Sequence, residues 1–256
     1  MRRHEARSIR FYHYSTFIFS GFFHSYRAAD CSTKRDTKMK RSTLIIGSSI
    51  ALITAFAVGT YMYTSQQKQE QQQIAQNSGQ ELNRFGAPSI GAAHAKVHIV
   101  EFFDPACEAC RAFYPVVKNT LNFNSDKVKL TLRYATFHQG SDYVAKALEA
   151  TRLQNKYWES VEAVLAAQPE WAAHGSPQPE LIWNALAQIG LDIEKAKLDM
   201  NSPQIAARLA QDAADVVTLK VQKTPSFFVN STPLTKFGAD EFNALVQSKV
   251  DLAYPK

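Results

Sequence analysis

The chain has 256 residues, of which 45% are hydrophobic and 20% charged, so it has room for one large domain or two small ones. Its formal net charge is +6, but the charge is unevenly divided. Residues 1–41 hold ten Lys/Arg and three Asp/Glu, a net of +7, whereas residues 42–256 hold nineteen and twenty, a net of −1. Because the basic excess lies upstream of an apolar segment, it indicates membrane topology and argues against nucleic-acid binding.

Residues 1–43 form a basic segment. Its first 38 residues are rich in aromatic side chains and arginine and show neither helical nor strand periodicity. Met39 is followed by two basic residues and then by an apolar run, which is typical of the start of an exported protein. We therefore expect translation to begin at Met39. Cys31 lies before that position, and we assign it no role.

Residues 44–63 carry no charge and are mostly apolar. About twenty residues at 1.5 Å each give roughly 30 Å, which is enough to cross a bilayer core. The alternative is a cleaved signal peptide with an Ala-Phe-Ala site at residues 55–57, but the apolar character continues past it and favours an uncleaved anchor. In both cases the basic flank predicts a cytosolic N-terminus. The rest of the chain is then expected at a bacterial inner membrane, on its periplasmic side or outside the cell.

Residues 64–84 are rich in glutamine and too polar to bury a core, so we expect a flexible or loosely helical tether. A folded domain is expected over residues 85–256. Its hydrophobic pattern predicts strands at 97–103, 128–134, 226–229 and 232–234, a helix from 107, helices beginning near 141, 157, 179, 192 and 203, and a final helix at 239–250.

Capping and periodicity add detail to the helical part of the domain. Ser141 and Asp192 are predicted N-caps, because their side-chain oxygens can accept hydrogen bonds from free backbone N–H groups. One face of the helix from residue 203 is expected to be buried, and its members are Ile205, Leu209, Ala213 and Val216. The element order predicts an α/β sheet interrupted by a helical insertion at about 138–220.

Cys107 and Cys110 are separated by two residues and stand where the first strand passes into a helix. Free N–H groups and the positive end of the helix dipole favour a thiolate at such a position. Since the thiolate is the species that attacks disulfides, the pair predicts thiol–disulfide exchange. Cys107, the N-terminal and more exposed cysteine, is expected to react with substrate, and Cys110 to resolve the mixed disulfide.

Two other uses of the cysteine pair are weaker. A structural disulfide that closes a four-residue loop would stabilise the fold by only about 2 kcal/mol, by extrapolation of chain-entropy estimates. A zinc site would need ligands from histidines at no recognisable spacing, namely His94, His98, His138 and His174. We therefore expect neither a metal nor another cofactor.

The domain resembles the DsbA-like branch of the thioredoxin superfamily over roughly residues 86–256. The resemblance rests on the Cys107/Cys110 pair after the first core strand, on Pro115 five residues beyond, and on Thr224-Pro225 before a later strand. It also rests on the roughly ninety residues between the second and third predicted strands, far more than a minimal thioredoxin has there. The resemblance implies a thioredoxin-like fold with an inserted helical domain.

The resemblance also implies roles for further residues. Pro225 would be cis and would bring the backbone of Thr224 beside the sulfurs, where a substrate peptide could pair as an added strand. Glu101 would be a buried acid that exchanges a proton with Cys110. The alternative for Glu101 is a carboxylate at a strand end that reaches solvent or pairs with a basic residue such as Lys96 or Lys129, and the sequence leaves both open.

Glu108, between the cysteines, departs from the Pro-His pair of the strongly oxidising DsbA pattern. At about 6 Å its charge would disfavour the Cys107 thiolate by roughly 0.7 kcal/mol in water. We therefore expect a weaker oxidant than that pattern implies.

The sequence thus predicts a membrane-tethered, exported thiol–disulfide oxidoreductase, most simply an oxidant. Its partners would be exported proteins with cysteine pairs and a membrane or soluble redox protein. Two alternatives stay open: a reductase or isomerase, and a non-enzymatic binding module with a thioredoxin fold.

Overall fold

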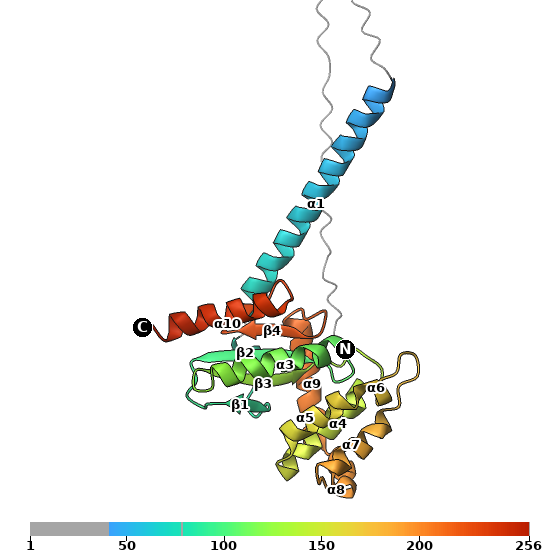
Figure 1. Ribbon diagram of the computed structural model, residues 1–256, viewed down its shortest axis with the longest axis vertical. Helices are drawn as coiled ribbons and strands as arrows, with labels where there is room; N and C mark the ends of the chain where they lie inside the picture. Colours follow the sequence, from blue (N-terminus) through green and yellow to red (C-terminus); the bar gives the residue numbers. More distant parts are fainter. Residues whose placement is uncertain (1–40, 78, 256) are drawn as a thin grey trace, which may run out of the picture. The chain divides into compact units, whose positions relative to one another are not determined.

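The computed structural model describes residues 41–77 and 79–255 (Figure 1). Met39 and Cys31 therefore lie outside the described residues. The chain divides into two units, residues 1–53 and residues 54–256, which we describe separately.

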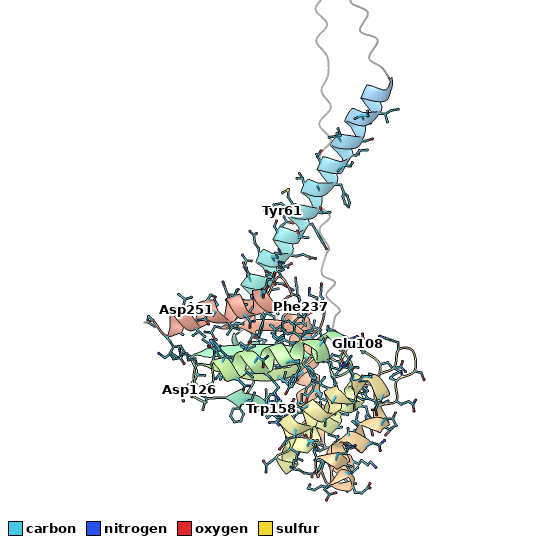
Figure 2. All side chains as sticks on the ribbon, viewed as in Figure 1. Tyr61, Glu108, Asp126, Trp158, Phe237 and Asp251 are labelled. Carbon is cyan, nitrogen blue, oxygen red and sulfur yellow. The ribbon has the colours of Figure 1, made fainter. Side chains whose placement is uncertain are left out.

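Helix α1, Arg41–Asn77, contains the apolar segment and continues through the glutamine-rich segment. Residues 45–74 are long and apolar enough to span a membrane, with a mean hydropathy of 1.7, and the large apolar side chains from Ile45 to Tyr63 are exposed (Figure 2). Hydroxyl groups on the helix bond back to carbonyls one turn earlier; for example, Ser49 donates to Ile45 and Thr60 to Phe56, both at 2.9 Å. These bonds satisfy the polar side chains without water, as a membrane-spanning helix requires.

A five-stranded sheet of order β1-β3-β2-β4-β5 is the centre of the domain. Strands β2 and β3 are parallel, and β4 runs antiparallel to β2. The bounds of β2, β3 and β4 agree with the sequence prediction, whereas β1 was not predicted because it has three exposed residues and no apolar pattern. The strands are β1 (Ser89–Gly91), β2 (Val97–Phe103), β3 (Val128–Tyr134), β4 (Ser226–Val229) and β5 (Thr232–Pro233).

Helices cover both faces of this sheet (Figure 1). Helices α3, Glu108–Phe123, and α10, Ala239–Ala253, pack on the face to which β2 contributes Val97, Ile99 and Phe103. The opposite face carries Val100 and Phe102 of β2, which cluster with Val216 and Leu219 at the end of α9. Because side chains alternate along a strand, Glu101 lies on the same face as Ile99 and Phe103, the face covered by α3.

The helical insertion lies between β3 and β4, as predicted. The expected helix from 179 to 189 is divided into a 3-10 turn and an α-helix, and the short helix at 168 was not foreseen. The insertion comprises α4 (Ser141–Thr151), a 3-10 turn (Arg152–Gln154), α5 (Tyr157–Ala166), α6 (Gln168–Trp171), a second 3-10 turn (Pro179–Leu181), α7 (Ile182–Gln188), α8 (Ile193–Asp199) and α9 (Pro203–Thr218).

The structure confirms one predicted cap in the insertion and corrects two other predictions. Asp192 caps α8 as expected, accepting from the N–H of Lys195 at 3.0 Å. Ser141 does not cap α4: it is the first helical residue, and its hydroxyl bonds Asp104 instead. Ala213 is exposed, contrary to expectation, because the buried face of α9 carries charged residues in its place.

Those charged residues pair with Arg133 of β3, which is fully buried. Its guanidinium bonds Asp212 and Asp215 of α9, each at 2.6 Å, and donates to the carbonyl of Glu81 at 2.6 Å. Arg84 completes the cluster by bonding Asp215 at 2.7 and 2.8 Å. The cluster fixes α9 against the sheet, and its charges are tolerable there only because they are paired.

We expect Arg133→Leu to lower the free energy of unfolding by about 3 kcal/mol, because it leaves the buried Asp212 without its cation. Urea unfolding of the full chain in detergent measures this. Lys118→Ala is the matched control, since it breaks an exposed ion pair with Glu162 of 2.7 Å and should cost less than about 1 kcal/mol. Equal losses for the two variants would contradict a role for the buried cluster in stability.

Candidate active site

The two cysteines occupy the first turn of α3. Cys107 is its N-cap residue, with extended backbone angles and no side-chain cap, and Cys110 lies one turn later. Both side chains are buried, Cys107 with 6% and Cys110 with 1% of its surface exposed. Cys107 is therefore the more accessible of the two, as expected. Both are free thiols.

The cysteines differ sharply in acidity. The hydrogen bond from the Cys110 thiol is the largest effect on Cys107; together with bonds from the Thr224 side chain and the backbone N–H groups of Cys110 and Ala109, it outweighs burial and lowers the pKa of Cys107 to about 5. Burial, reinforced by the bond to Cys107 and the charge of Glu101, raises the pKa of Cys110 far above its ordinary value. At neutral pH Cys107 is a thiolate and Cys110 a thiol.

The Thr224–Pro225 peptide bond is cis and lies beside Cys107. The Cys107 sulfur is 3.3 Å from the carbonyl oxygen of Thr224, a contact that suits the protonated thiol as donor. The thiolate is instead supported by the Thr224 side chain, whose hydrogen bond lowers the pKa of Cys107. Thr224 therefore offers a partner to either protonation state.

Glu101 is buried in β2, on the face that carries α3. It is 2% exposed, and among the described residues its Oε2 has no hydrogen-bond partner. Burial, with a smaller effect of the Cys107 charge, raises the pKa of Glu101 to about 8. Of the two alternatives for Glu101, the structure therefore has the buried acid and not a carboxylate paired with lysine.

Glu108 is an exposed residue in the first turn of α3, at the N-terminal end of that helix (Figure 2). Its carboxylate lies 3.3 Å from Nε2 of His174, and both side chains are largely exposed. An exposed pair of this kind is screened by solvent and holds neither group firmly.

Asp104 is a site residue that the sequence did not reveal. It is fully buried at the end of β2, and its carboxylate accepts from the N–H groups of Ala106 at 2.9 Å and Phe137 at 2.7 Å and from the hydroxyl of Ser141. His138 adds its backbone N–H at 3.0 Å and its ring Nδ1 at 2.8 Å. One carboxylate thus joins the loop before the cysteines to the loop before α4. In the sequence, the only signal of this role is the position of Asp104 directly after the predicted strand.

Gln168 of α6 is a second residue that sequence reasoning missed. Its amide N–H₂ donates to the carbonyls of Pro105 at 2.7 Å and Cys107 at 3.1 Å, and its oxygen accepts from Nε of Arg111 at 3.0 Å. Because the arginine can only donate, the amide orientation is fixed. The helical insertion thereby holds the backbone of the segment that leads into α3 and ends at Cys107.

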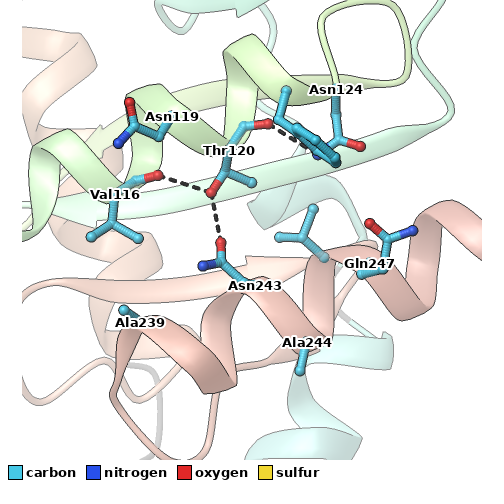
Figure 3. A pocket seen from close by; sticks show the side chains of 10 residues that line it. Val116, Asn119, Thr120, Asn124, Ala239, Asn243, Ala244 and Gln247 are labelled. Atoms are coloured by element: carbon cyan, nitrogen blue, oxygen red, sulfur yellow. Dashed lines mark hydrogen bonds between the residues drawn. The ribbon is translucent and has the colours of Figure 1, made fainter.

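A groove of about 650 Å³ lies between α3 and α10, away from the site (Figure 3). Neither cysteine lines it. Thr120 and Asn243 bond across it at 2.8 Å, and Asn119 and Gln247 lie along its edges.

A protein-family model described as thioredoxin matches residues 83–248. The chain belongs to this family. The match includes the sheet, both cysteines, the cis-proline and the whole helical insertion.

Three relatives illustrate the range of proteins that carry this domain. A thioredoxin-like oxidoreductase from Silicibacter pomeroyi has a solved structure with a TM-score of 0.59 and 28% identity, over 70% of this chain and 99% of that one. A protein of Bacillus anthracis named "Probable disulfide bond formation protein D" is 27% identical over 75% of this chain and 90% of its own length. A Na(+)/H(+) antiporter NhaA of Herminiimonas arsenicoxydans is 28% identical, but the chain spans only 22% of its length.

The relatives matched along most of their length support a thiol–disulfide oxidoreductase of the disulfide-bond-forming type. The short match to the antiporter carries no transport activity over to this chain.

We expect the Cys107 thiolate to titrate with a pKa of about 5 and Cys110→Ala to raise that value by about one unit or more, because the variant removes the strongest hydrogen bond to the sulfur. Absorbance at 240 nm or the pH dependence of alkylation measures the titration. Below pH 5 the thiolate signal should be lost. A pKa near 9 in the wild type would contradict the described hydrogen bonding.

Proposed function

We propose that this protein is a membrane-tethered, exported thiol–disulfide oxidoreductase that oxidises cysteine pairs in other exported proteins. The single observation that carries the proposal is the acidity difference between Cys107 and Cys110. A stabilised thiolate favours the reduced protein over its disulfide, and a protein whose reduced form is stabilised is an oxidant.

The reaction would run in two exchanges. A substrate thiolate attacks Cys107 Sγ of the disulfide, because that sulfur is the more exposed. The bond between the two sulfurs breaks, and Cys110 leaves with the electron pair. A second substrate thiolate then attacks the substrate sulfur of the mixed disulfide, and Cys107 leaves as the thiolate that its hydrogen bonds stabilise. The substrate loses two electrons and gains a disulfide.

Glu101 would supply the proton that the leaving Cys110 needs. Its pKa of about 8 means that it is largely protonated at pH 7. The charge of Glu101, when ionised, raises the pKa of Cys110, which supports a place for Glu101 near that thiol. Since Cys110 is a poor thiolate, transfer of this proton lowers the barrier to its departure.

Membrane tethering is supported by the apolar helix and its basic flank, and the location would be the inner membrane with the domain in the periplasm. A separate membrane or soluble redox protein would return Cys107 and Cys110 to the disulfide by accepting two electrons.

A reductase or isomerase is the second candidate, and Glu108 is the observation that favours it. Its negative charge beside Cys107 opposes the thiolate and therefore stabilises the disulfide. The hydrogen bonds to the sulfur are direct and Glu108 is exposed, so we place oxidation first.

We expect Glu108→Gln to raise the reduction potential by tens of millivolts and to lower the pKa of Cys107, because one pKa unit corresponds to about 30 mV for a two-electron couple. Titration against glutathione measures the potential. An unchanged or lower potential would show that Glu108 does not restrain oxidation.

Two assays on the full chain test the proposal. We expect the disulfide form to reactivate a reduced, cysteine-containing substrate, with insulin reduction by the dithiol form slower, and Cys107→Ser to abolish both. Fast insulin reduction without oxidative refolding would favour the reductase. If neither assay shows activity, the non-enzymatic binding module is the remaining candidate.

A further inference from the structure

His138 has a fixed place beside the redox site that thiol–disulfide exchange does not itself require. It lies in the loop between β3 and α4, and its backbone and its ring both bond Oδ2 of Asp104. The ring is 49% exposed, whereas the carboxylate that holds it is fully buried. A histidine in an unconstrained surface loop would have neither bond.

The contact with Asp104 assigns the protons of the ring. A carboxylate only accepts, so Nδ1 is the donor and carries a hydrogen in both charge states. Nε2 is therefore the nitrogen that gains or loses a proton. The buried Asp104 stabilises the doubly protonated, positive form.

Asp104 also connects His138 to the sulfur. The Asp104 carbonyl accepts from the N–H of Cys107 at 3.0 Å, and its Oδ1 accepts from the N–H of Ala106 at 2.9 Å. The residue that holds the imidazole thus holds the turn that carries Cys107. Neither residue between the cysteines is a cation, so the protonated form of His138 would supply a positive charge near the thiolate.

We propose that His138 is a positioning residue of the redox equilibrium: held by Asp104, its positive form stabilises the Cys107 thiolate and, below the pKa of His138, makes the disulfide a stronger oxidant than it would be without that charge. The inference rests on the proposed exchange chemistry and adds to it the residue that makes its driving force depend on pH.

The titratable groups that act on His138 are Asp104 at the end of β2, Cys107 in the turn and Glu108 on α3. Burial alone lowers the pKa of His138, but the bond to Asp104 and these three negative charges together raise it. The direct hydrogen bonds to the Cys107 sulfur are larger than the effect of the imidazolium, so we expect His138 to change the pKa of Cys107 by less than about one unit.

The sign of the coupling follows from charge. In the dithiol protein Cys107 is negative above pH 5, whereas in the disulfide it carries no charge. The pKa of His138 must then be higher in the dithiol than in the disulfide. By linkage, protonation of His138 lowers the pKa of Cys107 by the same amount.

The first experiment is a ¹³C NMR titration of the histidine rings in the full chain in detergent, with each redox state measured from pH 5 to 9. We expect the pKa of His138 to be about 0.5 to 1 unit higher in the dithiol state. Equal values in the two states would overturn the proposal.

The second experiment compares the wild type with His138→Gln, and His94→Gln, at an exposed residue, is the control. Below the pKa of His138 we expect the variant to be about three- to tenfold less oxidising against glutathione, or about 15 to 30 mV lower in potential. Above that pKa the two should converge, and His94→Gln should match the wild type throughout. A gap that is constant with pH would indicate a structural role alone and overturn the proposal.

These readouts separate the inference from the proposed function. If the chain oxidises no substrate but the pKa of His138 depends on redox state, the proposed function fails and the coupling stands. If the chain is an active oxidant and His138 titrates alike in both states, the coupling fails and the function stands.

Discussion

Cys107 stands at the N-cap of α3, where backbone N–H groups have no carbonyl of their own helix to bond, and the chemistry of the site depends on that placement. The sulfur accepts from the N–H groups of Ala109 and Cys110 and from the Cys110 thiol. Any residue with a negative side chain would gain from such a site, but only a thiolate there can also form and break a bond with a partner sulfur three residues away.

The surroundings enforce this placement from three sides. Asp104 follows β2 directly, and its carboxylate ties the turn to the loop before α4. Thr224, before the cis-proline, approaches the sulfur from the segment that leads into β4. Glu101 lies on the face of β2 that carries α3, and its burial raises its pKa to about 8, so it is largely protonated at neutral pH. Glu101 and Asp104 thus come from β2 and the residue after it, and Thr224 comes from the segment before β4.

Much of this was predictable from local pattern. Strands β2, β3 and β4 were predicted to the residue because each is a short segment rich in β-branched, aromatic and other apolar residues. The cysteine pair was predicted because its meaning depends on spacing and on the neighbouring strand, and the cis-proline was implied by the family resemblance. These features are encoded within a few residues of where they act.

The rest depends on residues far apart in the chain, and local pattern does not encode it. Ser141 has the form of an N-cap, but Asp104, 37 residues away, takes its hydroxyl. Ala213 fits the apolar period of α9, but Asp212 and Asp215 occupy the buried positions because they pair with Arg133 of the sheet. Gln168 looks like any polar residue until its carbonyl partners are known.

The bond from Gln168 to the active-site turn means that the insertion cannot be treated as a detachable decoration of a smaller redox fold. A trimmed protein in which a plain connection replaced residues 138–220 would keep both cysteines and the sheet, but it would lose an amide that steadies the turn, together with His138 and Ser141. Transplanting only the cysteine motif into a minimal scaffold would therefore transfer the reacting atoms without the hydrogen bonds that hold the turn before them.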